Sequence, residues 1–243
     1  LTVKDCTING RAENVVDKGL YLRCNIGAAT KNNSNSTWNT ALGTGNFKDC
    51  TIKDKSGENS GGIYDNCTFN NINGNIHGTF DIENCTIDNW NVNGGGYDPN
   101  YTFTNSNLNN FSITFGYWYE GAVTTFDNCT INNDDYLLKL PHYSMKQPIS
   151  ILNSSFTSNG NDGMVVFYDD RTGGSAGELV KQDMLTIKNN KINLDNSEYV
   201  VTGIGKDTVN NINISFSDNE LVSDKLKLYD ESCNEISNIK ISQ

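Results

Sequence analysis

Three segments of the sequence combine aromatic rings with carboxylates, and this combination could act on a carbohydrate. They are FGYWYEG at residues 115–121, NNDDYLLKLPHYS at residues 132–144 and FYDDRTGG at residues 167–174. Aromatic rings stack on the apolar faces of sugars, and carboxylates bond to their hydroxyl groups. The candidate catalytic residues in these segments are Glu120, Asp169 and Asp170. The candidate ligand-binding residues are Tyr117, Trp118, Tyr119, Asp135, His142, Tyr143, Tyr168 and Arg171.

A repeat that runs through the chain must position these segments. Its phrase is an apolar residue, any residue, Asp or Asn, Cys, Thr and then Ile or Phe, as in FKDCTI at residues 47–52. Weaker copies carry Ser or Asn in place of Cys, and we call this position the slot. It falls at residues 6, 50, 67, 85, 106, 129, 154, 190 and 219, with spacings of 17, 18, 21, 23 and 25 between residues 50 and 154. A period of this size indicates stacked supersecondary units.

The residue before the slot is always Asp or Asn, and we expect the chain to turn a corner there. In an extended strand the slot residue and the apolar residue two places later point to the same side, whereas the apolar residue three places before the slot points to the opposite side. All three can face the interior only if the chain bends between them. Asp and Asn tolerate the left-handed backbone of a tight corner better than other side chains do. Helical periodicity is absent, so the units are β. The predicted corners are Asp5, Asp49, Asn66, Asn84, Asn105, Asn128, Asn153, Asn189 and Asp218.

Two stretches carry a resemblance to a known family. ISILNSSFTSNGNDGMVV at residues 149–166 resembles a unit of the right-handed parallel β-helix repeat family, and GGIYDNCTFNN at residues 61–71 resembles the Asn- and Cys-rich repeats of adhesin-like surface proteins. The resemblance implies three short parallel sheets wound into a solenoid, as in pectate lyases, phage tailspikes and adhesins. We therefore predict an all-β, right-handed parallel β-helix of about nine to ten coils, which at a spacing of ~4.8 Å form a rod roughly 45 Å long.

The predicted β-helix covers residues 1–224, and residues 225–243 are expected to form a C-terminal cap or the start of a missing segment. The stretch LYLRCNI at residues 20–26 could supply an extra coil through Cys24. The long gap between Ser154 and Asn190 requires an insertion, for which residues 171–178 are the simplest choice. The chain begins inside a repeat and not with Met, so we interpret it as a piece of a longer protein.

Counted from the slot of its own coil, Glu120 stands at the same offset as Tyr143 and Tyr168. If these segments leave the coils at one azimuth, their side chains form a groove along the rod. Glu120 and Asp169 would then have backbones roughly 10 Å apart, nearer the ~6.5–9.5 Å carboxylate separation of inverting glycosidases than the retaining one. One would be a general acid and the other a base for water. Arg171 could instead neutralise the carboxylate of a uronic or sialic acid. The alternative is that the rings fill the core and the acids are solvated.

Other regular features of the repeat have structural explanations. We expect an inward column of free thiols at Cys6, Cys50, Cys67, Cys85 and Cys129, because stacked side chains run parallel and not toward each other. We expect no zinc site, since no CxxC exists and the two histidines lie far from any pair of cysteines. Glycosylation patterns occur at Asn66, Asn84, Asn128 and Asn153, but we expect these amides to be buried in a column of corners. The threonine after the slot should point outward, and an ice-binding array would need a second rank that the sequence lacks.

Charge and composition disfavour several classes of function. The chain has 29 acidic and 18 basic residues, a net charge of -11, which works against binding to nucleic acid. No apolar run approaches the ~20 residues of a membrane span, so we predict no membrane insertion. The sequence contains neither GxSxG nor HExxH nor a complete P-loop, and we predict no cofactor and no metal.

The leading functional hypothesis is an extracellular module that recognises cell-surface polysaccharide, of the phage tailspike or tail-fibre type. Such a protein would be a homotrimer, and assembly in a reducing cytosol would suit unpaired cysteines. Endoglycosidase activity is a second layer of this hypothesis. The runner-up is a non-enzymatic adhesin-like surface protein. A secreted polysaccharide lyase is the third, with acid pairs at residues 134–135 or 169–170 as candidates for holding calcium, although no lyase motif matches residue by residue.

Overall fold

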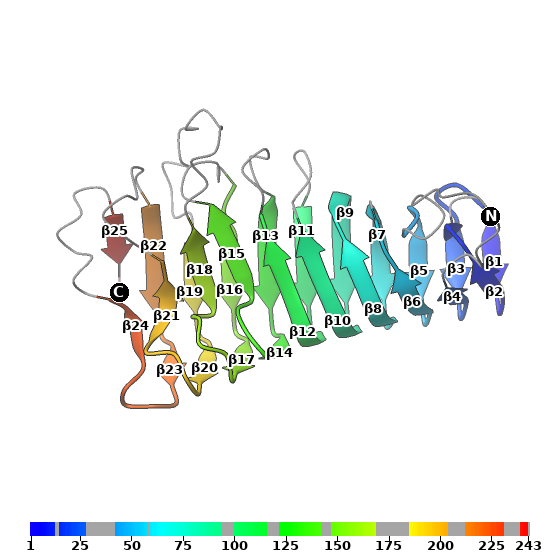
Figure 1. Cartoon of the computed structure of the whole chain (residues 1–243). Helices are drawn as coiled ribbons and strands as arrows, with labels where there is room; N and C mark the ends of the chain where they lie inside the picture. Colours follow the sequence, from blue (N-terminus) through cyan, green and yellow to red (C-terminus); the bar gives the residue numbers. More distant parts are fainter. Residues whose placement is uncertain are drawn as a thin grey trace.

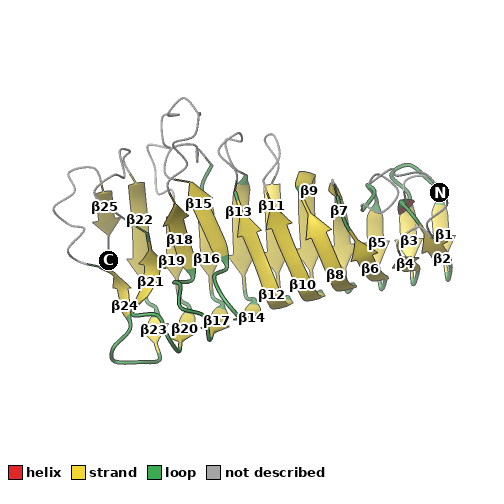
Figure 2. Cartoon of the chain, viewed as in Figure 1, coloured by secondary structure: helices red, strands yellow, loops and turns green. Residues whose placement is uncertain are grey.

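The computed structural model describes residues 1–12, 15–27, 42–57, 59–93, 100–115, 122–141, 147–168, 185–203, 212–230 and 239–242. Within these ranges the chain forms 25 strands that follow one another along an elongated rod (Figure 1). Strands and the short loops between them account for nearly all of the described chain (Figure 2). These ranges contain no helix with the length and apolarity of a membrane span.

One strand of each successive coil joins a parallel sheet that we call sheet A. Sheet A consists of β1 (Thr2–Lys4), β3 (Leu20–Leu22), β5 (Asn46–Lys48), β7 (Asn59–Asp65), β9 (Ile76–Glu83), β11 (Asn100–Thr104), β13 (Val123–Asp127), β16 (Ile149–Leu152), β19 (Leu185–Lys188), β22 (Ile212–Ser217) and β25 (Ile239–Ser242). The order along the sheet is the order along the chain, so each coil pairs with the coil before it and the coil after it.

The strand after each corner joins a second parallel sheet, sheet B. It consists of β2 (Thr7–Asn9), β4 (Asn25–Gly27), β6 (Thr51–Lys55), β8 (Thr68–Gly74), β10 (Thr86–Asn93), β12 (Asn107–Thr114), β14 (Thr130–Asn133), β17 (Ser155–Ser158), β20 (Lys191–Leu194) and β23 (Glu220–Leu221). A further row of strands continues from the end of β12. It consists of β15 (Leu138–Pro141), β18 (Val165–Tyr168), β21 (Tyr199–Thr202) and β24 (Lys227–Tyr229), and we call it the third face.

This arrangement is a parallel β-helix, as the sequence predicted. The coil through Cys24 is present, because β3 and β4 take their places in sheets A and B. Sheet A has eleven strands in the described chain, against the nine to ten coils expected. The strands after residue 224 continue the same pattern, since β24 pairs with β21 and β25 pairs with β22.

All nine predicted corners have the left-handed backbone that a tight turn requires. Their φ values lie between 49° (Asn153) and 56° (Asn189 and Asp218). Arg23 takes this role, with φ of 51°, in the coil through Cys24. The corners stack one above the next, since the N–H of Asn66 bonds to Glu83 O and that of Asn84 to Thr104 O. The prediction of corners with a left-handed backbone at these nine positions is therefore confirmed.

The corner amides are exposed, so the expectation that they are buried is wrong. The amide of Asn128 donates to Asn105 Oδ1 at 2.7 Å, and that of Asn153 donates to Asp127 Oδ1 at 2.7 Å. These bonds run side by side along the outside of the rod. Asn66, Asn84, Asn128 and Asn153 are all exposed. The reason is geometric: a left-handed residue at a convex corner directs its side chain away from the interior, so burial no longer argues against glycosylation there.

Slot residues point inward and link neighbouring coils. The N–H of Cys67 donates to Cys85 Sγ at 3.3 Å, and the N–H of Ser154 donates to Asn190 Oδ1 at 2.9 Å. The six described cysteines are free thiols, and five of them are buried. Cys6 is exposed, contrary to the expected buried column, because it lies in the first coil of the described chain and has a covering coil on one side alone. Burial raises the pKa of Cys129 to about 11.

Aromatic and aliphatic columns fill the rest of the interior. Residues three places before the slot stack ring on ring, with centroids of Tyr21 and Phe47 4.9 Å apart and those of Phe103 and Phe126 4.8 Å apart. Residues two places after the slot form a parallel column on sheet B, which includes Ile52 and Ile87, both fully buried. Stacked rings are offset across one coil spacing, so each ring buries its faces against the coils on either side.

The cationic side chain of Lys55 lies inside the N-terminal part of the rod. Lys55, which is 1% exposed, donates hydrogen bonds to the carbonyl oxygens of Gly10 at 2.5 Å and Gly27 at 2.6 Å. These two glycines belong to the two preceding coils, so one side chain joins three coils. Burial, and to a lesser extent the charge of Arg11, lowers the pKa of Lys55 to about 8.

Candidate functional site

Two of the predicted site residues, Asp135 and Tyr168, fall in the described chain. The other nine lie outside the described residues: Glu120, Asp169, Asp170, Tyr117, Trp118, Tyr119, His142, Tyr143 and Arg171. The insertion expected at residues 171–178 also lies outside them. The proposed pairing of Glu120 with Asp169 therefore stays a prediction.

The strands that precede these three segments lie side by side on the third face. Ile113, near the end of β12, pairs with Leu138 of β15, and Leu138 pairs with Val165 of β18. Pro141, the last residue of β15, pairs with Tyr168, the last residue of β18. The ends of β12, β15 and β18 therefore lie side by side on neighbouring coils. A groove shared by the three segments requires this arrangement.

A cluster of two tyrosines and a lysine, Tyr136, Lys139 and Tyr168, occupies this region, and we call it the Tyr–Lys–Tyr cluster. The Lys139 ammonium lies 5.8 Å from the ring centroid of Tyr136 and 5.5 Å from that of Tyr168, within the ~6 Å range of a cation–π contact. Tyr168 donates a hydrogen bond to Phe115 O at 2.5 Å, and the Tyr136 hydroxyl lies 3.1 Å from Thr114 Oγ1. The rings are therefore fixed, and no described carboxylate forms an ion pair with Lys139.

Two carboxylates lie beside this cluster. Partial burial raises the pKa of Asp135, and the negative charge of Asp162 in the next coil raises it further. Gly160 makes this arrangement possible, because a β-carbon there would lie 2.6 Å from Asp134 O and 2.9 Å from the Asp135 carboxylate. Ser158 also holds the loop, since its hydroxyl donates to Asp135 O at 3.0 Å. The ionised Asp135 carboxylate accepts hydrogen bonds from ligand hydroxyl groups.

Two adjoining hollows, of about 250 and 420 Å³, lie on the outer surface of sheet B where it meets the third face. Both are lined by Asn110, Asn133 and Asp134, so they form one groove, which we call the amide groove. Asp135 and Tyr136 line the first hollow and connect the groove to the Tyr–Lys–Tyr cluster. The other lining residues are Asn89, Asn91, Ser112, Asn109, Asn132, Thr157, Asn159 and Asp195.

Hydrogen bonds between coils hold the polar side chains of the amide groove in place. Asn109 donates to Asp88 Oδ1 at 2.8 Å, and Asn132 donates to Asn109 Oδ1 at 3.3 Å. Ser112 donates to Asn91 Oδ1 at 2.9 Å. Each of these amides and hydroxyls keeps further hydrogen-bonding capacity for a ligand. The groove thus offers a row of oriented donors and acceptors at the spacing of the coils.

A second set of corners creates the surface that this groove occupies. Asp54, Asn71, Asn89 and Asn110 each lie five residues after a first corner, with φ values of 55°, 57°, 60° and 49°. Asn133 holds the equivalent position in the next coil, but its backbone is not left-handed. Its side-chain amide points inward and donates hydrogen bonds to Phe111 O at 2.6 Å and Tyr136 O at 3.0 Å. This change of corner opens the groove. The second corners have a signal in the sequence, an Asn or Asp five residues after each of the first corners at residues 49, 66, 84, 105 and 128, and the prediction did not use it.

Comparisons with known proteins add little to this picture. No protein-family model matches the chain. No curated protein matches it either. Among solved structures, the mannuronan C-5 epimerase AlgE4 A-module of Azotobacter vinelandii is similar at 14% sequence identity and a TM-score of 0.42, over 100% of this chain and 71% of that one. The assignment of a parallel β-helix rests on the strand pairing of the chain itself. Within the described residues, no group of three His, Cys, Asp or Glu side chains lies close enough together to hold a metal ion.

Proposed function

We propose that this protein recognises a polysaccharide, which lies along the amide groove and against the Tyr–Lys–Tyr cluster. The observation that carries the proposal is the continuity of the two hollows through Asn110, Asn133 and Asp134. A polymer of sugars needs hydrogen-bonding partners repeated along its length, and stacked coils repeat them every ~4.8 Å. The rings of Tyr136 and Tyr168 supply apolar faces at one end of the groove.

Ligand binding tests this proposal directly. A glycan array identifies the polysaccharide, and titration with an oligosaccharide from it measures affinity. We expect Asn132→Ala and Asp134→Ala to weaken binding by about tenfold each, because each removes one or two hydrogen bonds to the ligand. Asn70→Ala is the matched control, since Asn70 is exposed on the same face of sheet B, in the coil next to the groove, and does not line it. Equal binding by all three variants would place the ligand elsewhere.

The finer part of the proposal is an extracellular module of the phage tailspike or tail-fibre type. Six free thiols in the described chain support it, because such proteins fold in a reducing cytosol before they act outside the cell. In this case the protein assembles as a homotrimer. Size-exclusion chromatography with light scattering should then give three times the mass of the chain. A monomer that still binds glycan would favour the alternative, an adhesin-like surface protein.

Catalysis is a separate layer of the proposal, carried by Glu120, Asp169 and Asp170. Glu120→Gln and Asp169→Asn should each abolish the release of new reducing ends while glycan binding persists. The products distinguish the reaction classes. A hydrolase leaves saturated ends, whereas a lyase leaves an unsaturated sugar that absorbs ultraviolet light. Undiminished cleavage in the Glu120→Gln, Asp169→Asn double variant would exclude this assignment.

A further inference from the structure

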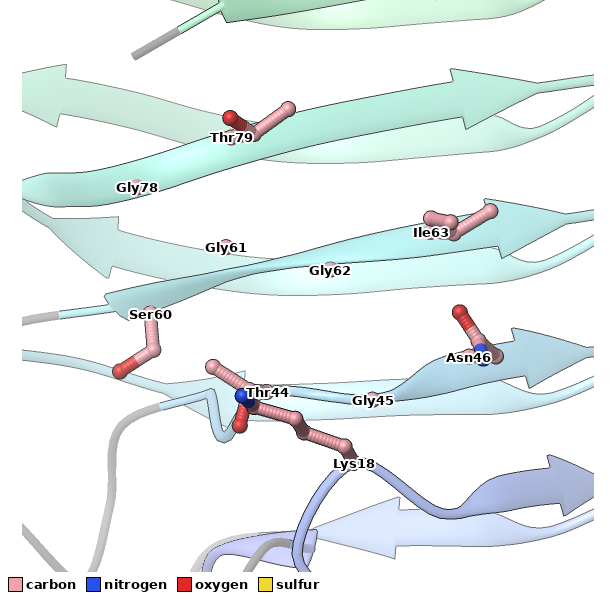
Figure 3. A pocket seen from close by; sticks show the side chains of 10 residues that line it. All are labelled: Lys18, Thr44, Gly45, Asn46, Ser60, Gly61, Gly62, Ile63, Gly78 and Thr79. Carbon is pink, nitrogen blue, oxygen red and sulfur yellow. The ribbon is translucent and has the colours of Figure 1, made fainter. Parts of the chain in front are cut away.

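A separate groove lies on sheet A near the N-terminal end of the rod (Figure 3). It has a volume of about 590 Å³, inside the ~300–1,000 Å³ range of small-molecule sites. Its floor is the backbone of β7 and β9 at Gly61, Gly62 and Gly78, where no side chains project. We call it the glycine groove. It lies on a different sheet from the amide groove, and the two share no lining residue.

The strand pairing explains why this floor is bare. The register of β7 and β9 shifts between Ser60 and Gly62. A β-carbon on Gly61 would lie 2.1 Å from Thr79 O, and Gly78 has a φ of 88°, which L side chains rarely adopt. Side chains are therefore excluded from the centre of the groove. β-bulges of this kind occur next to binding sites, where they reshape a surface locally.

The walls of the groove combine an apolar side chain with hydroxyls. Ile63 stands at one side and is 53% exposed, so its aliphatic surface is available to a ligand. Ser60 and Thr79 supply hydroxyls at the other strand positions (Figure 3). The Ser60 hydroxyl is held from inside the rod, where it accepts a hydrogen bond from Arg11 Nη2 at 2.8 Å. A flat backbone floor with an aliphatic wall suits the apolar face of a pyranose ring, and the hydroxyls suit its edge.

Lys18 is the one charged side chain among the described lining residues. Its side chain extends from the turn before β3 to Thr44, at one edge of the groove (Figure 3). Two other cations on this side of the rod form ion pairs: Lys48 pairs with Asp65 at 2.7 Å, and Arg23 pairs with Asp5 at 2.7 Å. No described carboxylate pairs with Lys18. In a chain with a net charge of -11, this cation at the edge of a bare floor is a local site for an anion.

We propose that the glycine groove binds one sugar unit that carries a carboxylate. The ring lies on the backbone of Gly61 and Gly78 with its apolar face against Ile63, and its carboxylate pairs with the Lys18 ammonium. A charge-assisted hydrogen bond of this kind is about twice as strong as a neutral one. The site is independent of the amide groove, so occupation of one does not require occupation of the other.

Nuclear magnetic resonance titration tests the proposal, because the floor of the groove consists of glycine amides. Trigalacturonate is the acidic probe and maltotriose is the neutral probe of equal length. We expect trigalacturonate to shift the amide signals of Gly61, Gly62 and Gly78, and maltotriose to leave them in place. Raising the salt concentration should weaken binding, since the ion pair is exposed to solvent.

Two charge-reversal variants distinguish the effect of the Lys18 charge from the effect of the net charge of the protein. Lys18→Glu should weaken trigalacturonate binding by about tenfold or more. Lys53→Glu changes the net charge equally and should bind as the wild type does, because Lys53 is exposed on sheet B. Equal binding by both variants, equal loss in both, or shifts away from the three glycines would each overturn the proposal. None of these outcomes bears on the amide groove, which is tested by its own variants.

Discussion

The backbone N–H of Cys85 donates a hydrogen bond to the Oγ of Ser106, 3.0 Å away in the next coil. The same Oγ donates onward to Thr104 O at 2.8 Å. Cysteine does this with one sulfur, since Cys85 Sγ accepts from Cys67 N and contacts Glu83 O at 3.1 Å. Asparagine divides the two tasks between its oxygen and its nitrogen. The slot therefore selects for a small side chain that both accepts and donates, which Cys, Ser and Asn share.

Removing this capacity should destabilise the rod. Ser106→Ala leaves the buried N–H of Cys85 without its acceptor, so we expect the free energy of unfolding to fall by about 1–3 kcal/mol. Ser106→Cys restores a group that accepts and donates and should lose less. Urea denaturation followed by circular dichroism measures both. Equal stability of the alanine variant and the wild type would show that the slot bond contributes nothing.

The corners make a second prediction, about the backbone. Asn128 has a φ of 53° and donates to Asn105 Oδ1 at 2.7 Å. Asn128→Ala loses the bond and keeps the unfavourable φ, so we expect a loss of about 1–2 kcal/mol in the free energy of unfolding. Asn128→Gly also loses the bond but adopts the left-handed backbone freely, so it should be the more stable of the two. The reverse order in a urea titration would contradict this account of the corner.

Lys55 makes the stability of the protein depend on pH. Its pKa is lowered to about 8 in the folded chain, from 10.5. Between these values the unfolded chain holds a proton that the folded chain has lost, so raising the pH favours folding. We expect the unfolding free energy of the wild type, relative to Lys55→Met, to rise from about pH 8 to pH 10. The comparison cancels the titration of all other groups, and a difference that does not change with pH would refute the assignment.

Asp135 should have the opposite dependence. Burial and the charge of Asp162 raise its pKa above the ordinary value of 3.8, so the folded chain binds this proton more tightly than the unfolded chain does. Stability from this group is lost as the pH rises through that range. Asp135→Asn removes the repulsion and should be slightly more stable than the wild type at pH 7, by a small amount because the carboxylate is exposed. The advantage should disappear in acid, and thermal unfolding at pH 3 and pH 7 measures it.

Much of the fold could be predicted because one local requirement recurs. A corner needs a residue with a left-handed backbone, and the Asp or Asn before each slot correctly predicted such a residue at all nine positions. The coil through Cys24 was harder to recognise because Arg23 takes the corner there. The exposure of corner side chains such as that of Asn128 was not predicted. The alternation of side chains along a strand does not extend through a turn, so it does not show whether a corner side chain points inward or outward.

Less of the candidate site could be predicted. The offset of Tyr168 along its coil matches its position in the structure beside the end of β15, because β15 and β18 pair in register. Lys139 was not predicted, since a single lysine on a strand carries no signal until two rings are found beside it. The amide groove depends on the inward turn of Asn133, which follows from its bonds to Phe111 and Tyr136 across one coil and one turn.

The stacking of like corners also makes the rod modular in length. Asp65 and Glu83 are register partners in sheet A, and Asn66 and Asn84 are the corners that follow them. Excising residues 66–83 would join Asp65 directly to Asn84 and leave every later coil with an equivalent neighbour, because each coil contacts chiefly those adjacent to it. Evolution or a protein engineer can therefore change the reach of such a molecule by whole turns, and this particular excision would also remove Gly78 and Thr79 from the glycine groove while leaving the amide groove in place.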